Sequence, residues 1–183
     1  GSEMCIRDRL VALINDILRL SQLDEGGALP HEQVSVLELA QEAARSLTAQ
    51  AAAQAVHISV TGTAGTVFGV RRLLYEIARN LCENAVKYNV PGGSVTVEVA
   101  ETDRDVALLV RDTGIGIPEG DQSRVFERFY RVDKSHSRAI GGTGLGLSIV
   151  KHGAQYHNAL LSLESEPDVG TTITVVFPRN MRP

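Results

Sequence analysis

Residues 70–88 of this 183-residue chain read VRRLLYEIARNLCENAVKY. Their apolar members recur at helical spacing, which predicts a helix with one side in a core. Asn80, Asn84, Lys87 and Tyr88 stand at i, i+4, i+7 and i+8, so all four project from one polar face. Two carboxamide oxygens one turn apart can ligand Mg²⁺, and a lysine one turn further can meet a phosphate. The alternative is an ordinary solvated helix face.

An aspartate stands at the end of the next predicted strand. Val106, Leu108 and Val110 alternate with other residues, and this predicted strand forms an antiparallel hairpin with a strand at 95–99. Asp112 ends the hairpin and precedes TGIGIP at 113–118. A carboxylate before two glycines indicates an acceptor in a pocket where the backbone comes close to a flat ligand. A simple turn aspartate is the alternative.

A third group, GTGLGLS at 142–148, opens a helix predicted from Leu145 to about His157. The free N–H groups and the positive end of the dipole at such a helix start suit a phosphate. The spacing G-x-G-x-G and the polar residues at 135–140 argue against a Rossmann dinucleotide site. The segment also lacks the Gly-Lys-Ser of a P-loop.

The remaining pattern predicts an α/β fold with a layer of helices on one mixed sheet. A long loop without sustained periodicity, from Thr113 to Gly144, suggests a lid. The further predicted elements are strands at 34–36, 56–60, 66–69, 160–164 and 171–177 and a helix at 37–55.

Composition limits the class of protein. The chain is 43% hydrophobic, enough for the core of one compact domain, and its net charge is −4. That balance gives no sequence-wide basis for binding nucleic acid or an anionic membrane. No leader pattern is present, and no apolar run approaches the roughly 18 residues of a bilayer span. Cys5 and Cys82 have no metal-ligand spacing, and Cys82 is expected to be a core thiol in a reducing cytoplasm.

The first residues form a separate segment. Gly1 and Ser2 look like a tag remnant. From Leu10, apolar residues recur at helical spacing until Gly26, in a stripe too broad for a lone surface helix. It is either an ordinary core helix or one strand of a helical bundle.

Four segments in order resemble the N box, first glycine box, F box and second glycine box of sensor histidine kinases. They are NLCENAVKY at 80–88, DTGIGIP at 112–118, FERFYR at 126–131 and GTGLGLSIVK at 142–151. The flanking pattern extends the likeness over 30–178. The resemblance implies the Bergerat fold, a two-layer α/β sandwich whose mixed, mostly antiparallel sheet is covered by three helices, preceded here by an N-terminal helix fragment.

The resemblance also implies roles for individual residues. Asp112 would accept from the adenine amino group, Asn80 and Asn84 would hold Mg²⁺, Lys87 would meet the phosphates of ATP, and Tyr88 would pack near the nucleotide. A lid at 119–141 would fold over ATP, packed down by Phe126 and Phe129. Asn80, Lys87, Arg131 and Arg138 are the implied catalytic set, although each lid arginine could equally be solvated. The other implied nucleotide contacts are Gly114, Gly116, Ile117, Gly142, Thr143, Gly144, Leu145, Gly146 and Leu147.

The same resemblance implies how the chain is organised. Residues 1–28 would be the tag remnant and the end of the second dimerisation helix, and 29–183 the ATP-binding catalytic domain. The implied partners are the protein's own phosphoacceptor and dimerisation helices, mostly absent here, and a cognate response regulator; no nucleic acid is expected. The full-length protein would be a homodimer anchored in the inner membrane, with this domain in the cytoplasm.

The phosphoacceptor histidine of such kinases lies in a His-Glu-Leu-Arg-Thr-Pro setting. None of His31, His57, His136, His152 and His157 has that setting, and His31 is interpreted as a loop histidine. The chain is therefore expected to hold Mg·ATP and to transfer the γ-phosphate to a histidine outside it.

Three other functions are open. ATPases of the same fold, such as gyrase, have a glutamate in place of Asn80 to activate water, and asparagine cannot be a base. A nucleotide-binding regulatory module or scaffold without kinase activity would be expected to have broken boxes. A serine kinase that acts on an anti-sigma antagonist is a third possibility, against which the helix from Leu10 argues.

Overall fold

The computed structural model describes residues 29–132 and 144–179, together with positions 6, 10, 11, 13–15, 17, 18 and 21. Those separate positions are helical, which confirms the predicted N-terminal helix where it can be seen from Leu10 onward. Its predicted end at Gly26 lies outside the described residues, as does Cys5. Within the described part of the chain, every helix is too short or too polar to cross a membrane.

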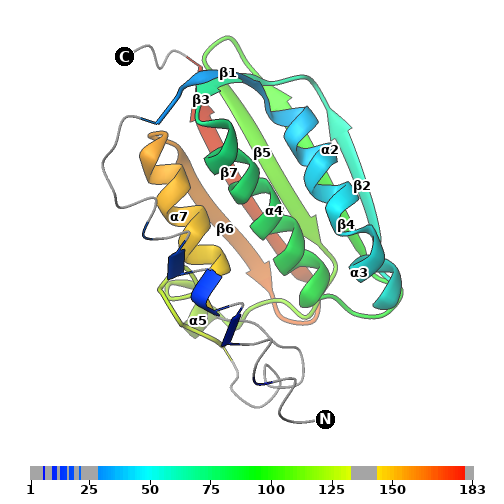
Figure 1. Ribbon diagram of the computed structural model, residues 1–183. Helices are drawn as coiled ribbons and strands as arrows, with labels where there is room; N and C mark the ends of the chain where they lie inside the picture. The colour runs from blue at the N-terminus through cyan, green and yellow to red at the C-terminus, as the bar shows by residue number, and fades with distance from the viewer. Residues whose placement is uncertain are drawn as a thin grey trace.

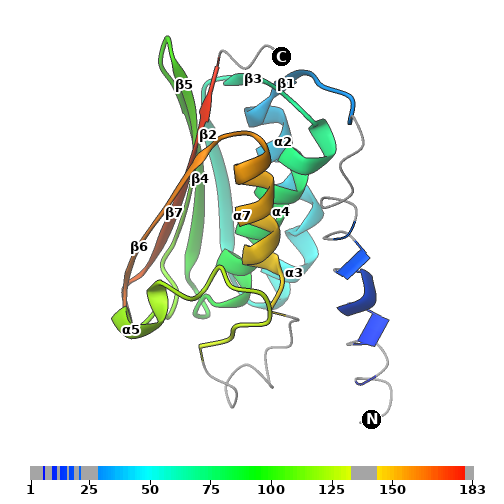
Figure 2. The same ribbon diagram turned by 90° about the vertical axis from the view of Figure 1, so that its left-hand side faces the viewer.

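A five-stranded sheet in the order β2-β4-β5-β7-β6 is covered by helices on one face (Figures 1 and 2). The β2–β4 pair is parallel and the other pairs are antiparallel, so the predicted mixed, mostly antiparallel sheet is confirmed. The strands are β2 (His57–Gly62), β4 (Ser94–Glu101), β5 (Asp105–Asp112), β6 (Leu160–Glu166) and β7 (Gly170–Pro178). The helices are α2 (Val36–Ser46), α3 (Thr48–Ala53), α4 (Arg71–Lys87), α5 (Glu119–Gln122) and α7 (Gly146–Tyr156).

Two element predictions were wrong in detail. The helix predicted at 37–55 is two helices, α2 and α3, broken at Leu47, which is 2% exposed and has φ −105° and ψ 4°. On either side of the break, the Ser46 and Thr48 hydroxyls donate to the carbonyl oxygens of Ala43 and Arg45 and so compete with the helical hydrogen bonds. The strands predicted at 34–36 and 66–69 do not join the main sheet but form a two-stranded antiparallel ribbon of β1 (Glu32–Ser35) and β3 (Thr66–Gly69). β1 ends at Ser35 because the Ser35 side chain accepts from the Glu38 N–H and caps α2.

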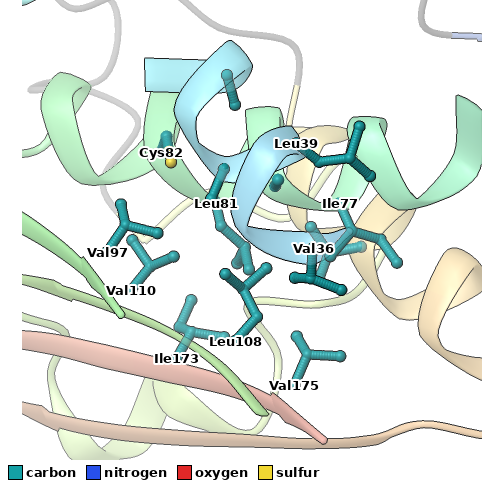
Figure 3. Packing of buried hydrophobic residues seen from close by; sticks show 14 of the residues in the cluster. Val36, Leu39, Ile77, Leu81, Cys82, Val97, Leu108, Val110, Ile173 and Val175 are labelled. Atoms are coloured by element: carbon teal, nitrogen blue, oxygen red, sulfur yellow. The ribbon is translucent and has the colours of Figure 1, made fainter. Parts of the chain in front are cut away.

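The core lies between the helices and the inner face of the sheet. Alternate residues of β4, β5 and β7 meet the apolar sides of α2 and α4, as Figure 3 shows for ten labelled side chains. Cys82 is fully buried there, and burial raises the pKa of its thiol to about 12, so the predicted core thiol is confirmed. Asn80, Asn84 and Lys87 lie on another side of α4, where Asn80 is buried and Asn84 and Lys87 are half-buried.

Two glycines bring α7 close to α4. Gly146 and Gly153 are seven residues apart, about two helical turns, and so lie on one face of α7. A Cβ at Gly153 would be 2.9 Å from Ile77 Cγ1, and one at Gly146 would be 3.2 Å from Asn80 Oδ1. The first turn of α7 therefore lies directly beside Asn80.

His157 joins the far ends of the same two helices. It is 1% exposed, its Nε2 accepts from the Val70 N–H at 3.1 Å, and its Nδ1 lies 2.8 Å from the Gly153 carbonyl oxygen. A neutral imidazole with its proton on Nδ1 satisfies both bonds. The start of α4 and the end of α7 are thus tied through one side chain.

This contact predicts a pH dependence of stability. Burial lowers the pKa of His157 below its usual 6.5, so the unfolded chain takes up a proton more readily than the folded protein. The contribution of His157 to the free energy of unfolding is therefore complete above about pH 6.5 and is lost as the pH falls toward the folded-state pKa. His157→Leu should cost about 1–3 kcal/mol at neutral pH, since the buried Val70 N–H loses its acceptor.

Urea denaturation at about pH 7.5 and about pH 5.5 measures both effects. The wild-type protein should lose more stability than His157→Leu between the two values. Equal losses would show that His157 does not stay neutral in the folded protein.

Candidate nucleotide-binding site

The predicted site residues gather at one end of the molecule. The C-terminal half of α4, the end of β5 and the start of α7 lie at the end opposite the β1–β3 ribbon (Figure 1). Two parts can be distinguished there, one around Asp112 and one around Asn80.

Asp112 is the last residue of β5 and is half-buried. Burial raises the pKa of its carboxyl to about 6, although hydrogen bonds from the backbone N–H groups of Gly114 and Thr171 work in the opposite direction. The Gly114 N–H lies 2.8 Å from Oδ1, and Thr171 pairs with Asp112 in the register of β5 and β7. At neutral pH the side chain is thus an anion at a poorly hydrated position, where an additional donor would be bound strongly.

Gly114 lets the segment after Asp112 pass close to α4. A Cβ at Gly114 would lie 2.3 Å from the Tyr88 carbonyl oxygen and 2.9 Å from Asp112 Oδ1. The Ile115 N–H donates to the same Tyr88 oxygen at 3.0 Å. Gly116, at φ +69°, approaches the Glu166 carbonyl oxygen in a similar way. The structure therefore brings Asp112, Gly114 and Tyr88 together, and the close approach it shows is to the protein's own backbone.

Three polar residues that the sequence did not indicate hold Ile117 in place. The Ile117 N–H donates to Ser165 Oγ at 2.8 Å, and Ser165 Oγ lies 2.7 Å from Thr171 Oγ1. Gln122 Nε2 donates to the Ile117 and Ser165 carbonyl oxygens at 2.9 and 3.0 Å. The network depends on the pairing of strands that are distant in sequence, and no local spacing could indicate it.

The second part is built on α4. Asn80 is 6% exposed, and its Nδ2 donates to the Glu76 carbonyl oxygen at 2.7 Å and to Glu76 Oε2 at 3.3 Å. Its Oδ1 lies on the side of Gly146. Asn84 and Lys87 are half-buried on the same helix face. The hydrogen bonds of Asn80 leave an amide oxygen toward the start of α7.

The start of α7 is suited to an anion. The N–H groups of the first turn of a helix have no acceptor within the helix, and among the described residues no side chain caps α7. Leu145 and Ile149 are buried, and Leu13 of the N-terminal segment packs against them. Gly144 has φ +74°, and its carbonyl oxygen accepts from the Phe129 N–H at 2.9 Å. Leu147 is buried in the main core.

The predicted lid is only partly described. Phe126 packs against the core, whereas Phe129 is 55% exposed with φ +64°. The predicted packing of both side chains over ATP stays a prediction. The hydrogen bond from the Phe129 N–H to the Gly144 carbonyl oxygen holds the backbone at Phe129, and the side chain points to solvent. Arg131 is half-buried near the end of the described part, whereas Arg138, Gly142 and Thr143 lie outside the described residues.

The donor set fits a magnesium ion held together with a phosphate chain. Asn80 and Asn84 supply neutral amide oxygens one turn apart, and Mg²⁺ prefers oxygen ligands while keeping waters and phosphate oxygens. Gly146 is in the first turn of α7, and a Cβ placed on it would lie 3.2 Å from Asn80 Oδ1. A metal on the amides and an anion at α7 would therefore be neighbours.

A helix-covered sheet with a half-buried acceptor carboxylate, paired amides and a glycine-led helix start defines an ATP-binding domain of the Bergerat type. Residues 69–181 match the family described as "Histidine kinase-, DNA gyrase B-, and HSP90-like ATPase". The chain belongs to this family, as its sequence predicted.

The relatives place the chain more narrowly. It is 41% identical over 174 residues to the sensor-like histidine kinase SenX3 of Mycolicibacterium smegmatis, covering 93% of this chain and 45% of that protein. The mycobacterial sensor histidine kinase MprB superposes with a TM-score of 0.71 at 30% identity, over 81% of this chain and 97% of that one. Full-length ShkA in complex with AMPPNP superposes with a TM-score of 0.80 at 26% identity, over 93% and 36%.

The chain spans less than half the length of the SenX3 relatives it matches. It is the ATP-binding catalytic domain of a two-component sensor histidine kinase.

Proposed function

We propose that this chain binds Mg·ATP and transfers the γ-phosphate to a histidine on a separate phosphoacceptor helix. The observation that carries the proposal is the placement of the Asn80 amide oxygen beside the start of α7, at the end of the sandwich where Asp112 presents a half-buried acceptor. The complex of ShkA with AMPPNP, an ATP analogue, supports nucleotide binding by this fold.

Each part would bind one part of the nucleotide. Asp112 would accept from the adenine amino group, with Gly114, Gly116, Ile117 and Tyr88 around the base. Asn80 and Asn84 would hold Mg²⁺, which neutralises phosphate charge when bound. Lys87 and the segment from Gly142 to Leu147 would meet the phosphates, and Arg131 or Arg138 would reach the terminal ones.

The residues favour transfer to a nucleophile over hydrolysis. An amide at Asn80 cannot take a proton from water, so the protein's contribution is to orient the phosphate chain and exclude water around it. A nucleophile positioned in line with the γ-phosphate is then required. The setting of a phosphoacceptor histidine is found at none of the five histidines of this sequence.

The N-terminal segment supports an assembly with further helices. Leu13 contacts α7, while the other described apolar positions from Leu10 to Leu18 are 44–55% exposed. These are Leu10, Val11, Ile14, Ile17 and Leu18. Residues 1–28 would then contain the end of a dimerisation helix and 29–183 the catalytic domain, in a homodimeric, membrane-anchored protein that acts with a response regulator.

A transfer assay in trans tests the proposal. With radiolabelled ATP and Mg²⁺, label should appear on an added helical hairpin that carries a kinase phosphoacceptor histidine, and not on this chain. Transfer should be slow, because effective concentrations of the order of millimolar, typical of a short covalent link, are missing. A hairpin with glutamine in place of the histidine is the matched control.

Two outcomes would contradict the proposal. Acid-labile label on this chain without the hairpin would show a phosphoacceptor among its own histidines. Rapid release of inorganic phosphate without transfer would favour the ATPase alternative.

A further inference from the structure

Glu76 lies one helical turn before Asn80, and its side chain is half-buried. Its Oε2 is 3.3 Å from Asn80 Nδ2, and its carbonyl oxygen is 2.7 Å from the same nitrogen. Two acceptors therefore meet the amino side of the Asn80 amide.

This arrangement fixes which way the amide points. If the amide were rotated by half a turn, Asn80 Oδ1 would face the Glu76 carbonyl oxygen and carboxylate at those same short distances. Oxygen would then oppose oxygen twice, and both hydrogen bonds would be lost. With Nδ2 toward Glu76, Oδ1 lies toward Gly146, where a Cβ would be 3.2 Å away.

The surroundings identify Glu76 as the carboxylate that acts on Asn80. The next acid on this face, Glu83, is paired with Arg79 at 3.4 Å. Gly146 and Gly153 let α7 approach α4, so that Asn80 is nearly enclosed. A polar side chain with so little room depends on its hydrogen bonds for its orientation.

We propose that Glu76 is a positioning residue, whose carboxylate holds the amino group of Asn80 so that Oδ1 is presented to Mg²⁺. This role rests on the proposed function, in which Asn80 is a ligand of the metal of Mg·ATP. Glu76 acts through Asn80 and not on the phosphates, so it contributes to the effect of magnesium on binding and not to binding of the nucleotide itself.

Calorimetry with ATP, once with Mg²⁺ and once with a chelator, tests this role through the ratio of the two dissociation constants. Glu76→Leu should lower the enhancement by magnesium about three- to tenfold, the effect of losing one hydrogen bond. Glu76→Gln keeps an acceptor oxygen and should retain an enhancement close to that of the wild type. Glu42→Leu is the matched control, because it removes an exposed carboxylate that pairs with Arg71 at 3.1 Å, at the far end of α4.

The outcomes separate the possible explanations. Equal losses of the magnesium enhancement in Glu76→Leu and Glu76→Gln would show that the charge of Glu76 matters and not the orientation of Asn80. An unchanged ratio of dissociation constants in Glu76→Leu would show that Glu76 has no positioning role. Glu76→Ala, checked by its melting temperature, gives the same test if the leucine variant misfolds. If the wild-type protein bound ATP no better with Mg²⁺ than without it, the proposed function itself would be wrong and the role of Glu76 with it.

Discussion

Replacing Asp112 by asparagine is expected to weaken ATP binding by about ten- to a hundred-fold, or roughly 1.5–3 kcal/mol. The asparagine oxygen can still accept from the Gly114 N–H, 2.8 Å from Oδ1 in the wild type. The new amino group would then face the adenine amino group, donor against donor. Titration calorimetry of both proteins measures the difference, and equal isotherms would show that Asp112 does not bind the base.

The same carboxyl gives ATP binding a pH dependence. Its pKa is raised to about 6, and protonation would place an O–H on the oxygen that faces the adenine amine, where an acceptor is needed. ATP affinity of the wild type should therefore decline as the pH falls through about 6, and binding near that pH should release protons. Asp112→Asn should lack this decline, and a matching decline in the variant would assign it to another group.

Loss of affinity can be separated from loss of folding. A folded-state pKa raised from 3.8 to about 6 means that the contribution of Asp112 to stability is complete below 3.8 and is lost as the pH rises through 6. The ionised carboxylate thus destabilises the folded protein at about pH 7.5. At that pH, Asp112→Asn should raise the free energy of unfolding by up to about 2 kcal/mol, and its melting temperature should not be lower than that of the wild type. A lower melting temperature would contradict this explanation.

Gly114→Ala is expected to have the second large effect. Its new Cβ would lie 2.3 Å from a backbone oxygen of Tyr88, which cannot move like the end of a flexible side chain. The segment after Asp112 would have to shift, at a cost of about 2–4 kcal/mol of stability. ATP affinity should fall with it, because Asp112 loses its hydrogen bond from Gly114.

Gly120→Ala provides the matched control. No described atom lies within 4 Å of a Cβ at Gly120, which is part of α5. This substitution should leave ATP binding unchanged and should stabilise the protein slightly, if at all, because alanine favours helix. Thermal melting and calorimetry of the two variants measure the contrast. Similar results for both would show that the contacts of Gly114 are not limiting.

Local patterns predicted the parts of the site that lie within one element. The spacing of Asn80, Asn84 and Lys87 places them on one face of α4, because helical periodicity is a property of the segment itself. Asp112 was predicted at the end of a strand because the alternation of apolar residues is also a property of the segment itself, and Asp112 is the last residue of β5. The roles of all these residues toward ATP stay predictions.

Contacts between distant segments could not be read from the sequence. Thr171 meets Asp112 through the pairing of β5 with β7. Ser165, which bonds to Ile117, is brought there by the β6–β7 hairpin that follows α7. The helix is broken at Leu47, where neither proline nor glycine marks the place. Nothing in the sequence around His157 predicted its burial, because the residues that enclose it, at the start of α4 and the end of α7, are distant in sequence.

The two hydrogen bonds of His157, from the Val70 N–H and to the Gly153 carbonyl oxygen, hold the C-terminal end of α7 to the start of α4. The N-terminal end of α7 lies at the proposed nucleotide site. The helix has 11 residues and is about 16 Å long. A tilt of about 5° around the anchored end would displace the first turn by about 1.4 Å, a simple lever calculation from that length. Such a displacement would pull the first turn away from Asn80 while leaving the packing near His157 almost unchanged. His157 thus holds one end of α7 to the start of α4, and the other end of the helix lies beside the amide that we assign to the metal.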